Sequence, residues 1–496
     1  MGVHPRFEQA LTKLDCVPRQ LLIGGQWRAS VSGETFSTTS PLTGQAILKV
    51  SRGGAADIDL AVAAARKAFD DGWSTASPFD RQAIILRLAE VVEKNYETIA
   101  ILDTLDMGAP ISRTRGGLRR ALQLLRYYAG QATSIHGETI PTSAPGDPFA
   151  CTLKEPLGVV GAITPWNAPF GMCVWKVGPA LATGCTVVLK PAEQSPLSAL
   201  YFGQLCLEAG VPEGVVNVVT GFGDAGARLA EHPDVDKVSF TGSTITGQHI
   251  IRASAGNVKR LSLELGGKSP HIVFADANLE KAAPAAAMAV FQNSGQICSA
   301  GTRLFVEDSI HDEFLDRVVE AAGRLVVGDA LDETTQLGPV VESAHMEKVL
   351  DYIDAGVSEG ASLALGGKRV EERSIKDGYY IQPTIFSNVD DGMKIAREEI
   401  FGPVLSVLRF SSIDEVVSRA NATSFGLGSG VWTTDVAKAH SMGRRLKNGS
   451  VWVNCYQMMD PAVPFGGYKM SGYGRESGSE HIREYLNTKG LWIATQ

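Results

Sequence analysis

The sequence lacks several features that would place it outside the ordinary globular proteins. No apolar run reaches the roughly 18 residues that a membrane-spanning helix needs. The segment from Met1 to Leu22 has no apolar core of signal-peptide length, and its acids Glu8 and Asp15 argue against a transit peptide. The seven cysteines include no CxxC pair, and the nine histidines show no HExxH or other ligand spacing. We therefore expect a cytoplasmic protein in a reducing compartment, with no metal site.

Basic residues are also fewer than acidic ones. The chain has 46 Lys and Arg against 54 Asp and Glu, which gives a net charge of −8. This balance disfavours a nucleic acid or an anionic membrane as a partner. Linkers, repeats and low-complexity segments are absent as well. With 496 residues, 44% of them hydrophobic, the chain is long enough for two or three domains with substantial cores.

Strand and helix signals alternate along the chain. Two amphipathic helices are expected over Asp57–Asp71 and Asp80–Met107. Four apolar runs then predict strands at 158–163, 186–189, 215–219 and 237–240, each followed by a helix, at 172–182, 195–209, 226–231 and 246–255. This alternation is typical of a parallel α/β sheet, and it predicts a Rossmann-like half.

A second α/β half follows Gly266. It begins with a helix over 277–293, a strand over 303–306 and a helix over 310–327, and it continues to about Gly467. We expect one domain from 1–130 and 156–265 and a second from 266–467. The segments 131–155 and 468–496 fit neither half well. Ile135–Ile140 looks like an exposed strand, and loose terminal strands are the alternative interpretation of both segments.

Cys298, in the segment Phe291–Cys298, and Glu264 are the most informative pair of residues. A thiolate attacks carbonyl carbon well, and a carboxylate can activate water to hydrolyse the thioester that follows. Alone, the pair is weak evidence, because a single Cys in a turn of this kind is more often a small buried hydrophobe. The remaining motifs supply the context.

These motifs give the chain its resemblance to a known family. In order, they are Ile23–Trp27, Thr164–Asn167, Leu189–Glu193, Phe240–Thr244, Leu263–Lys268, Phe291–Cys298, Glu398–Pro403, Pro464–Gly467 and Lys469–Glu476. The chain resembles the aldehyde dehydrogenase superfamily, specifically its hydrolytic, non-acylating, NAD(P)-dependent branch. The resemblance implies that 1–130 and 156–265 bind NAD, that 266–467 are catalytic, and that 131–155 and 468–496 form a small β-extension that pairs subunits into a dimer or a tetramer.

The cofactor site has two candidate motifs. Gly221–Gly226 is a literal GxGxxG, but no acidic residue closes a strand about 20 positions later, so a tight turn is as good an interpretation as a phosphate loop. Phe240–Thr244 is the better candidate, because Ser243 and Thr244 open a helix whose N-terminus offers unpaired N–H groups to phosphate.

The resemblance implies further cofactor contacts. Ser243 matches a pyrophosphate contact, Lys190 and Glu193 match contacts to the adenosine ribose, and Glu399 and Phe401 match residues that hold the nicotinamide ribose and ring. Because a carboxylate repels a 2′-phosphate, Glu193 favours NAD over NADP, although Lys190 leaves NADP open. The other cofactor residues expected are Thr164, Trp166, Gly223, Phe240, Gly242, Leu265, Gly266 and Lys348. His345 stands where relatives usually carry Gln, and it is either a ribose contact or a surface residue.

The resemblance also implies the catalytic roles. Cys298 adds to the aldehyde carbon, and Asn167, with the backbone N–H of Cys298, stabilises the resulting alkoxide. Glu264 then draws a proton from the water that hydrolyses the thioester. Lys176 assists proton movement or tunes Glu264. Taken alone, Asn167 also fits an ordinary turn residue at a strand end, and Lys176 fits a lysine on a helix surface.

The expected substrate pocket is mostly apolar. The residues aligned with the family's aldehyde tunnel are Ala168, Met172, Trp175, Ile297, Ser299, Gln457, Met458, Met459 and Phe465. Ala168 stands where many relatives carry an aromatic residue, which predicts a wide entrance. No Arg or Lys among these positions could bind a second carboxylate, and no acidic and aromatic cage could bind a quaternary ammonium. We expect a medium to large apolar or aromatic aldehyde, with Asp460 at the rim.

Other functions stay open at this point. A coenzyme A-acylating relative would normally lack the glutamate at position 264, and a non-enzymatic structural relative would be expected to lose Cys298 or Glu264. A semialdehyde dehydrogenase of the same superfamily is a further alternative. A cofactor-independent cysteine hydrolase would need a His base, and neither His271 nor His311 lies in a supporting motif.

Overall fold

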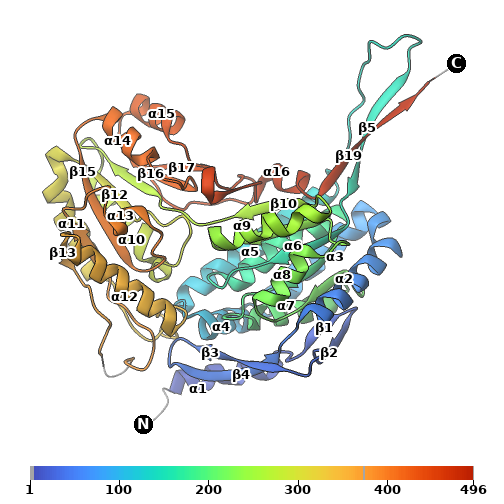
Figure 1. Cartoon of the computed structure of the whole chain (residues 1–496), viewed down its shortest axis with the longest axis horizontal. Coiled ribbons are helices and arrows are strands. Elements are labelled where there is room, and N and C mark those ends of the chain that lie inside the picture. The colour runs from blue at the N-terminus through green and yellow to red at the C-terminus, as the bar shows by residue number, and fades with distance from the viewer. Residues whose placement is uncertain (1–4, 373–374, 495–496) are drawn as a thin grey trace.

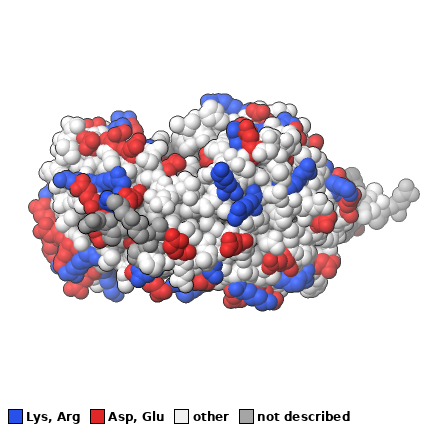
Figure 2. Space-filling model, turned by 90° about the horizontal axis from the view of Figure 1, so that it is seen from below, with Lys and Arg blue, Asp and Glu red and all other residues white. Residues whose placement is uncertain are grey.

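The computed structural model describes residues 5–372 and 375–494. Figure 1 shows two lobes, each built on a mixed sheet, and a two-stranded ribbon that projects away from the body. On the face seen in Figure 2, acidic and basic side chains are interspersed and do not gather into a patch of one sign. None of the described helices combines the length and the hydropathy that crossing a membrane requires.

The first lobe contains an eight-stranded sheet with the order β18-β10-β9-β6-β7-β8-β1-β2. The central strands are parallel: β6 (Val159–Ile163), β7 (Thr186–Lys190), β8 (Val216–Val218), β9 (Lys237–Thr241) and β10 (Arg260–Glu264). The antiparallel edge strands are β1 (Leu21–Ile23) and β2 (Gln26–Arg28) on one side and β18 (Gly472–Tyr473) on the other. Because strand order reverses at β6, a ligand crevice is expected at the carboxyl ends of β6, β7 and β9.

Helices cover both faces of this sheet, which explains why its central strands are buried on both sides. One face packs against α2 (Ala55–Asp70), α8 (Gly223–Glu231) and α9 (Thr244–Ala253). The other packs against α6 (Pro169–Thr183) and α7 (Leu197–Glu208), which are covered in turn by α3 (Pro78–Lys94), α4 (Tyr96–Met107) and α5 (Ile111–Ala132). Smaller elements here are α1 (Pro5–Leu11), η1 (Thr12–Cys16), η2 (Trp73–Thr75), η3 (Ser254–Gly256) and the hairpin of β3 (Thr35–Ser40) and β4 (Gln45–Ser51).

The second lobe contains a seven-stranded sheet with the order β13-β14-β15-β12-β11-β16-β17. Its strands are β11 (Pro270–Val273), β12 (Arg303–Glu307), β13 (Ser362–Leu365), β14 (Thr384–Ser387), β15 (Val404–Phe410), β16 (Gly428–Trp432) and β17 (Ser450–Val453), all paired in parallel except β13. Its helices are α10 (Leu279–Phe291), η4 (Gln292–Gly295), η5 (Asp308–Ile310), α11 (His311–Gly323), α12 (Ser343–Ser358), α13 (Lys394–Arg397), α14 (Ile413–Asn421) and α15 (Val436–Arg445).

The projecting ribbon pairs β5 (Phe149–Pro156) with β19 (Leu486–Ile493) in antiparallel register. Between the second lobe and β19, the chain forms η6 (Lys469–Ser471), β18 and α16 (Gly478–Arg483). Strand β18 extends the first sheet through β10, so the segment 468–496 contributes both to that sheet and to the ribbon. The domain boundaries expected from the sequence stay a prediction.

The parallel α/β architecture predicted from the sequence is confirmed, but three element predictions are wrong. The helix expected over Asp80–Met107 breaks at Asn95, whose Nδ2 donates to the Val91 carbonyl in addition to its backbone N–H. Ile135–Ile140 forms no strand, only an isolated bridge from Thr139 to Cys151. The helix expected over 277–293 ends at Phe291, because the following turn has left-handed backbone.

Candidate active site

Two adjoining cavities lie at the carboxyl ends of the first sheet, the larger within the first lobe and the smaller between the two lobes. The larger has a volume of 780 Å³ and the smaller 250 Å³. Their walls share Pro165, Trp166, Thr241, Gly242 and Ser243. The two cavities therefore form one continuous, elongated cleft at the position that the sheet topology predicts.

The structure brings every predicted cofactor residue to this cleft. The larger cavity is lined by Thr164, Trp166, Lys190, Glu193, Gly223, Phe240, Gly242 and Ser243. The smaller cavity is lined by Trp166, Gly242, Ser243, Leu265, Gly266, Lys348, Glu399 and Phe401. Residues that are up to 237 positions apart in the sequence, Thr164 and Phe401, thus face one groove.

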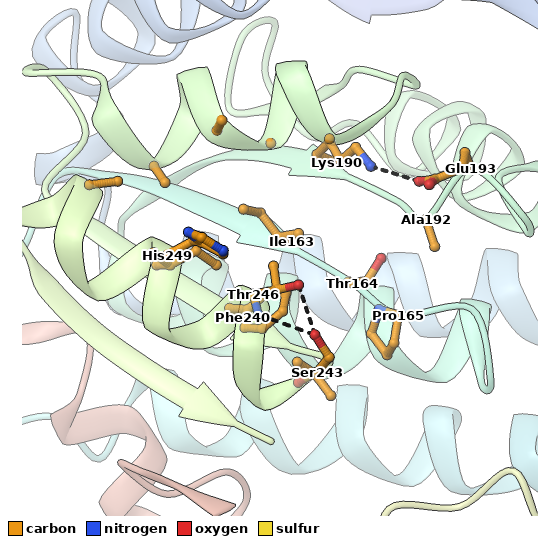
Figure 3. Close-up of a pocket in the computed structure, with 18 of the residues that line it drawn as sticks. Ile163, Thr164, Pro165, Lys190, Ala192, Glu193, Phe240, Ser243, Thr246 and His249 are labelled. Atoms are coloured by element: carbon orange, nitrogen blue, oxygen red, sulfur yellow. Dashed lines mark hydrogen bonds and ion pairs between the residues drawn. The ribbon is translucent and has the colours of Figure 1, made fainter. Parts of the chain in front are cut away.

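Ser243 caps the N-terminus of α9. Its Oγ accepts a hydrogen bond from the Thr246 backbone N–H at 3.2 Å, and the two hydroxyls lie 2.8 Å apart (Figure 3). A Cβ at Gly242 would lie 2.4 Å from the ring of Phe240, so glycine is needed where the strand turns into the helix. The helix N-terminus is left open toward the cleft and can receive an anion.

Lys190 and Glu193 stand together at the end of β7. The Lys190 Nζ lies 3.2 Å from a Glu193 carboxylate oxygen (Figure 3). Burial lowers the pKa of Lys190, although the charges of Glu193 and Asp224 act in the opposite direction. This pair presents both a donor and acceptors to the larger cavity, as binding of ribose hydroxyls would require.

The GxGxxG segment, Gly221–Gly226, forms a tight turn and part of the wall of the larger cavity. A Cβ at Gly221 would lie 2.4 Å from the Gly53 carbonyl oxygen, so Gly221 permits a close backbone approach. Gly223 and Gly226 line the larger cavity at the start of α8. The segment is therefore a tight turn whose following residues face the cleft.

The turn after α10 presents Cys298 to the smaller cavity. Asn293 and Ser294 have φ values of 55° and 54°, a left-handed conformation that side chains other than glycine rarely adopt. Hydrogen bonds over-determine this backbone: the Ser294 hydroxyl donates to the Gly338 carbonyl at 2.7 Å, and the Gln296 amide donates to Asn293 and accepts from the Val341 N–H. Strained backbone of this kind is often retained at functional sites.

Cys298 lies half-buried in the wall of the smaller cavity. Burial, reinforced by the charges of Glu399 and Glu264, raises the pKa of its thiol to about 12. The side-chain amide of Asn167 faces the same cavity and donates to the Gln296 carbonyl at 2.9 Å. Asn167 is therefore tied to the nucleophile's turn.

Glu264 ends β10 and faces the smaller cavity with a side chain that is 4% exposed. Neither of its carboxylate oxygens has a hydrogen-bond partner among the described residues. Burial, together with the charge of Glu476, raises its pKa well above the ordinary value, whereas the charge of Lys176 acts to lower it. A buried carboxyl group without hydrogen-bond partners and with a raised pKa is a candidate general base, because its ionised form takes up a proton more strongly than an ordinary carboxylate does.

Lys176 is not a surface residue. Its Nζ forms an ion pair with the Glu476 carboxylate, and both side chains are fully buried. Sequence reasoning missed Glu476 as a partner, although it ends the last motif. The surface interpretation of Lys176 is wrong, and the buried pair lies close enough to Glu264 for both charges to act on it.

His345 also belongs to the cleft. Its Nε2 lies 2.8 Å from the Phe401 carbonyl oxygen, and its ring contacts those of Trp166 and Phe401. Burial lowers its pKa to about 4, so the ring is neutral and Nε2 donates. The interpretation of His345 as a surface residue is wrong. Nearby, Glu399 accepts a hydrogen bond from the Gly267 N–H at 2.9 Å.

Of the predicted substrate residues, Met172 shares the cavity of Cys298 and the others differ in burial. Met172 lines the smaller cavity, and the rings of Trp175 and Phe465 lie 5.9 Å apart in the same hydrophobic cluster. Ala168 and Met459 pack against that cluster, as does Cys298. Ile297 and Ser299 flank Cys298, and Gln457 is half-buried. Met458, in contrast, is 71% exposed.

Sequence reasoning also missed Arg120, because it lies on α5 and in no motif. Its guanidinium carbon lies 4.6 Å from the centre of the Trp175 ring. The positions aligned with the aldehyde tunnel contain no basic residue, but the positive charge of Arg120 lies beside one of them, Trp175.

Comparison with known proteins supports the resemblance. A family model described as "Aldehyde dehydrogenase family" matches residues 27–491. Benzaldehyde dehydrogenase, mitochondrial, from Antirrhinum majus is 49% identical over 96% of this chain and 89% of its own length. An indole-3-acetaldehyde dehydrogenase variant from P. syringae, solved in complex with NAD+ and IAA, is 46% identical with a TM-score of 0.96, over 99% of this chain and 100% of that one.

A betaine aldehyde dehydrogenase from Staphylococcus aureus, solved in complex with NAD+, has a TM-score of 0.97 at 37% identity, over 99% of this chain and 98% of that one. The fold class predicted from the motifs, with a Rossmann-like domain and an α/β catalytic domain, is thereby confirmed. Family model, sequence relatives and solved structures agree along nearly the whole chain. The chain belongs to the aldehyde dehydrogenase family.

Proposed function

We propose that this protein oxidises an aldehyde to its carboxylic acid with NAD, through covalent intermediates on Cys298. One observation carries the proposal: Cys298 and Glu264 face the same 250 Å³ cavity, and that cavity opens into the longer cleft. A nucleophile and a base thus stand at one end of a groove long enough for an extended ligand.

The residues of the cleft fit a dinucleotide. Glu193 and Lys190 can bind the adenosine ribose, and the N-terminus of α9 at Ser243 can bind the pyrophosphate. The hydroxyls of Thr164 and Thr241, both buried, have no partner among the described residues and supply further polar groups. When bound, NAD supplies the hydride acceptor. Glu193 makes NAD the preferred cofactor, and Lys190 leaves NADP open.

Cys298 begins the reaction as a thiol, because its pKa lies far above neutral pH. It must lose its proton, ultimately to solvent, before its Sγ can add to the aldehyde carbon as a thiolate. Addition places negative charge on the former carbonyl oxygen. The Nδ2 of Asn167 and the backbone N–H of Cys298 stabilise that oxyanion.

Glu264 then acts on the thioester that remains on Cys298 after oxidation. Its carboxylate takes a proton from a water molecule, and the resulting hydroxide attacks the thioester carbon and releases the acid. The Lys176 and Glu476 pair behind it tunes the affinity of Glu264 for that proton. An acylating enzyme would have no use for this base, and Glu264 therefore favours hydrolysis over transfer to coenzyme A.

The substrate that we propose has a medium to large apolar or aromatic body. Met172, Trp175 and Phe465 give the region beside Cys298 an apolar, aromatic surface. Each well-buried CH₂ of a substrate contributes up to about 0.8 kcal/mol to binding there. The relatives named for benzaldehyde and for indole-3-acetaldehyde support an aromatic substrate, whereas the one named for betaine aldehyde is more distant in sequence.

We further propose a homo-oligomer, a dimer or a tetramer, paired through the β5 and β19 ribbon. Exposed apolar side chains on that ribbon support this assembly: Phe149, Leu153, Trp492 and Ile493 are all at least 40% exposed.

The compartment that we propose is the cytoplasm, because the seven cysteines are all free, although the Antirrhinum majus relative is named mitochondrial. Residues 1–130 and 156–265 are proposed to bind NAD, and 266–467 to carry the catalytic turn.

Appearance of NADH absorbance tests the proposal. Purified protein is mixed with NAD and, in turn, acetaldehyde, octanal, benzaldehyde, phenylacetaldehyde, succinic semialdehyde and betaine aldehyde. We expect turnover, with kcat/KM rising with apolar size from acetaldehyde to octanal and phenylacetaldehyde. The Cys298→Ala variant serves as the control. An absence of NADH with every aldehyde would refute aldehyde oxidation, whereas a best substrate of two carbons would refute only the apolar body.

A further inference from the structure

Arg120 has no part in the chemistry described above, yet it stands at the apolar region beside the nucleophile. Its guanidinium lies 4.6 Å above the ring of Trp175. That ring is itself fixed, since its Nε1–H donates to the Ser477 hydroxyl at 3.0 Å and it lies 5.9 Å from the ring of Phe465. Arg120 is thus placed over a fixed aromatic ring, a position that favours a cation.

The guanidinium of Arg120 has no counter-ion of its own. Within residues 5–372 and 375–494, it forms neither a hydrogen bond nor an ion pair with any acceptor. The carboxylate that acts on it electrostatically is Glu476, which is already paired with Lys176. Its N–H donors are therefore available, and they lie in a partly buried place where a hydrogen bond to a charged acceptor is strong.

A second arginine lies two helical turns earlier on the same face of α5. Arg113 is also partly buried, and its side chain makes no hydrogen bond or ion pair in the described part of the chain. Burial and the neighbouring charge of Arg120 lower the pKa of Arg113 to about 10. Two like charges held together without an acceptor cost free energy, and a bound anion would relieve that cost.

Arg120 is also close to the reacting end of the site. Trp175, over which Arg120 lies, follows Met172 by about one turn of α6, and Met172 lines the cavity that Cys298 faces. An aldehyde bound at Cys298 would therefore lay its body along this apolar wall. The opposite end of such a molecule would meet Arg120.

We propose that Arg120 binds an anionic group at the far end of the substrate, so that the preferred substrate is an oxo acid with an apolar or aromatic body between its aldehyde and its carboxylate. The inference rests on the proposed aldehyde oxidation and adds to it the charge of the substrate. The guanidinium over Trp175 carries a fork of N–H donors that matches a carboxylate, and Arg113 adds positive charge nearby. Carboxylate-bearing aldehydes, which the motif-aligned residues alone disfavour, thereby become good substrates.

Matched pairs of aldehydes test this charge. A homologous series of ω-oxo acids, beginning with succinic semialdehyde, and para-formylbenzoate are each compared with their methyl esters, which keep the body and lose the charge. For at least one member we expect wild-type protein to give a kcat/KM for the acid about tenfold or more above that for the ester, as a charge-assisted hydrogen bond to a carboxylate predicts.

Variants of α5 assign that preference to one residue. Arg120→Met should remove the preference, chiefly by raising KM for the acid at nearly constant kcat, since the contact is made equally before and during reaction. Kinetics on the esters should change little, which also shows that the variant folds. Arg120→Lys should keep part of the preference. Arg119→Met is the matched control, because it removes the neighbouring, exposed charge from the same helix and should leave the preference intact.

Binding without turnover gives an independent result. In the Cys298→Ala background, calorimetry should show tighter binding of para-formylbenzoate than of its methyl ester, and Arg120→Met should abolish the difference. Equal efficiency for acid and ester at every chain length, or an equal loss for both in Arg120→Met, would overturn the inference and leave aldehyde oxidation standing. Failure to form NADH from any aldehyde, charged or neutral, would instead refute the proposed function.

Discussion

Replacing Lys176 by Met should destabilise the protein and change the pH dependence of turnover. Lys176 and Glu476 are 0% and 1% exposed, so the substitution leaves a buried carboxylate without its counter-ion. Removing one partner of a buried ion pair typically costs about 3–5 kcal/mol, because the remaining charge keeps its desolvation penalty and loses its compensation. We expect the free energy of unfolding to fall by about that amount.

The same substitution acts on Glu264. The charge of Lys176 lowers the pKa of Glu264, against burial and the charge of Glu476, which raise it. Removing Lys176 therefore raises that pKa further. The ionised, base form of Glu264 is then present only at higher pH, so the alkaline rise of the deacylation rate should move to higher pH.

Urea unfolding, followed by tryptophan fluorescence, and the pH profile of steady-state NADH formation measure the two effects. Lys67→Met removes the lysine of an exposed ion pair with Asp71 and is the matched control, which should change neither. The double variant Lys176→Met with Glu476→Leu should recover much of the lost stability, because it removes both charges. Wild-type stability in Lys176→Met, together with an unmoved pH profile, would refute this account of the pair.

Three further substitutions have outcomes fixed by the structure. Glu193 should make kcat/KM for NAD exceed that for NADP by about tenfold or more, and Glu193→Gln should narrow the ratio; equal efficiency in wild type would show that Lys190 dominates. Gly267→Ala places a Cβ 2.4 Å from the Cys298 carbonyl oxygen and should lower kcat by about a hundredfold, while Gly323→Ala, with nothing within 4 Å, should not. Cys298→Ala should reduce turnover below about a thousandth of wild type and leave NAD affinity by calorimetry within a few-fold; greater residual turnover would remove Cys298 from its role.

The cleft was predictable from the sequence where strand ends coincide with short polar motifs. Lys190 ends β7 and Ser243 opens α9, and the parallel alternation of strands and helices requires both to meet at one edge of a sheet. Glu264 likewise ends β10. Local patterns of this kind locate a site because the carboxyl ends of parallel strands all lie at the same edge of the sheet.

Residues placed by tertiary packing were not predictable in this way. Arg120 has an unremarkable place on an amphipathic helix, and only the packing of α5 against α6 puts it on Trp175. Glu476 reaches Lys176 across 300 positions of sequence. The break at Asn95 depends on its side-chain bonds to Val91 and Tyr201, which no helical periodicity reports. Each of these features depends on a partner that is distant in sequence.

The central claim, that Cys298 carries an acyl group which Glu264 releases, is tested most directly by Glu264→Gln. Glutamine keeps the size of a side chain whose carboxylate is buried and without a partner among the described residues, and it removes only the base. Rapid-quench measurement should show one burst of NADH, roughly equal to the concentration of active sites, followed by a stall, and mass spectrometry should find the acyl group on Cys298. Continued turnover at the wild-type rate, with no acyl group on Cys298, would contradict the account.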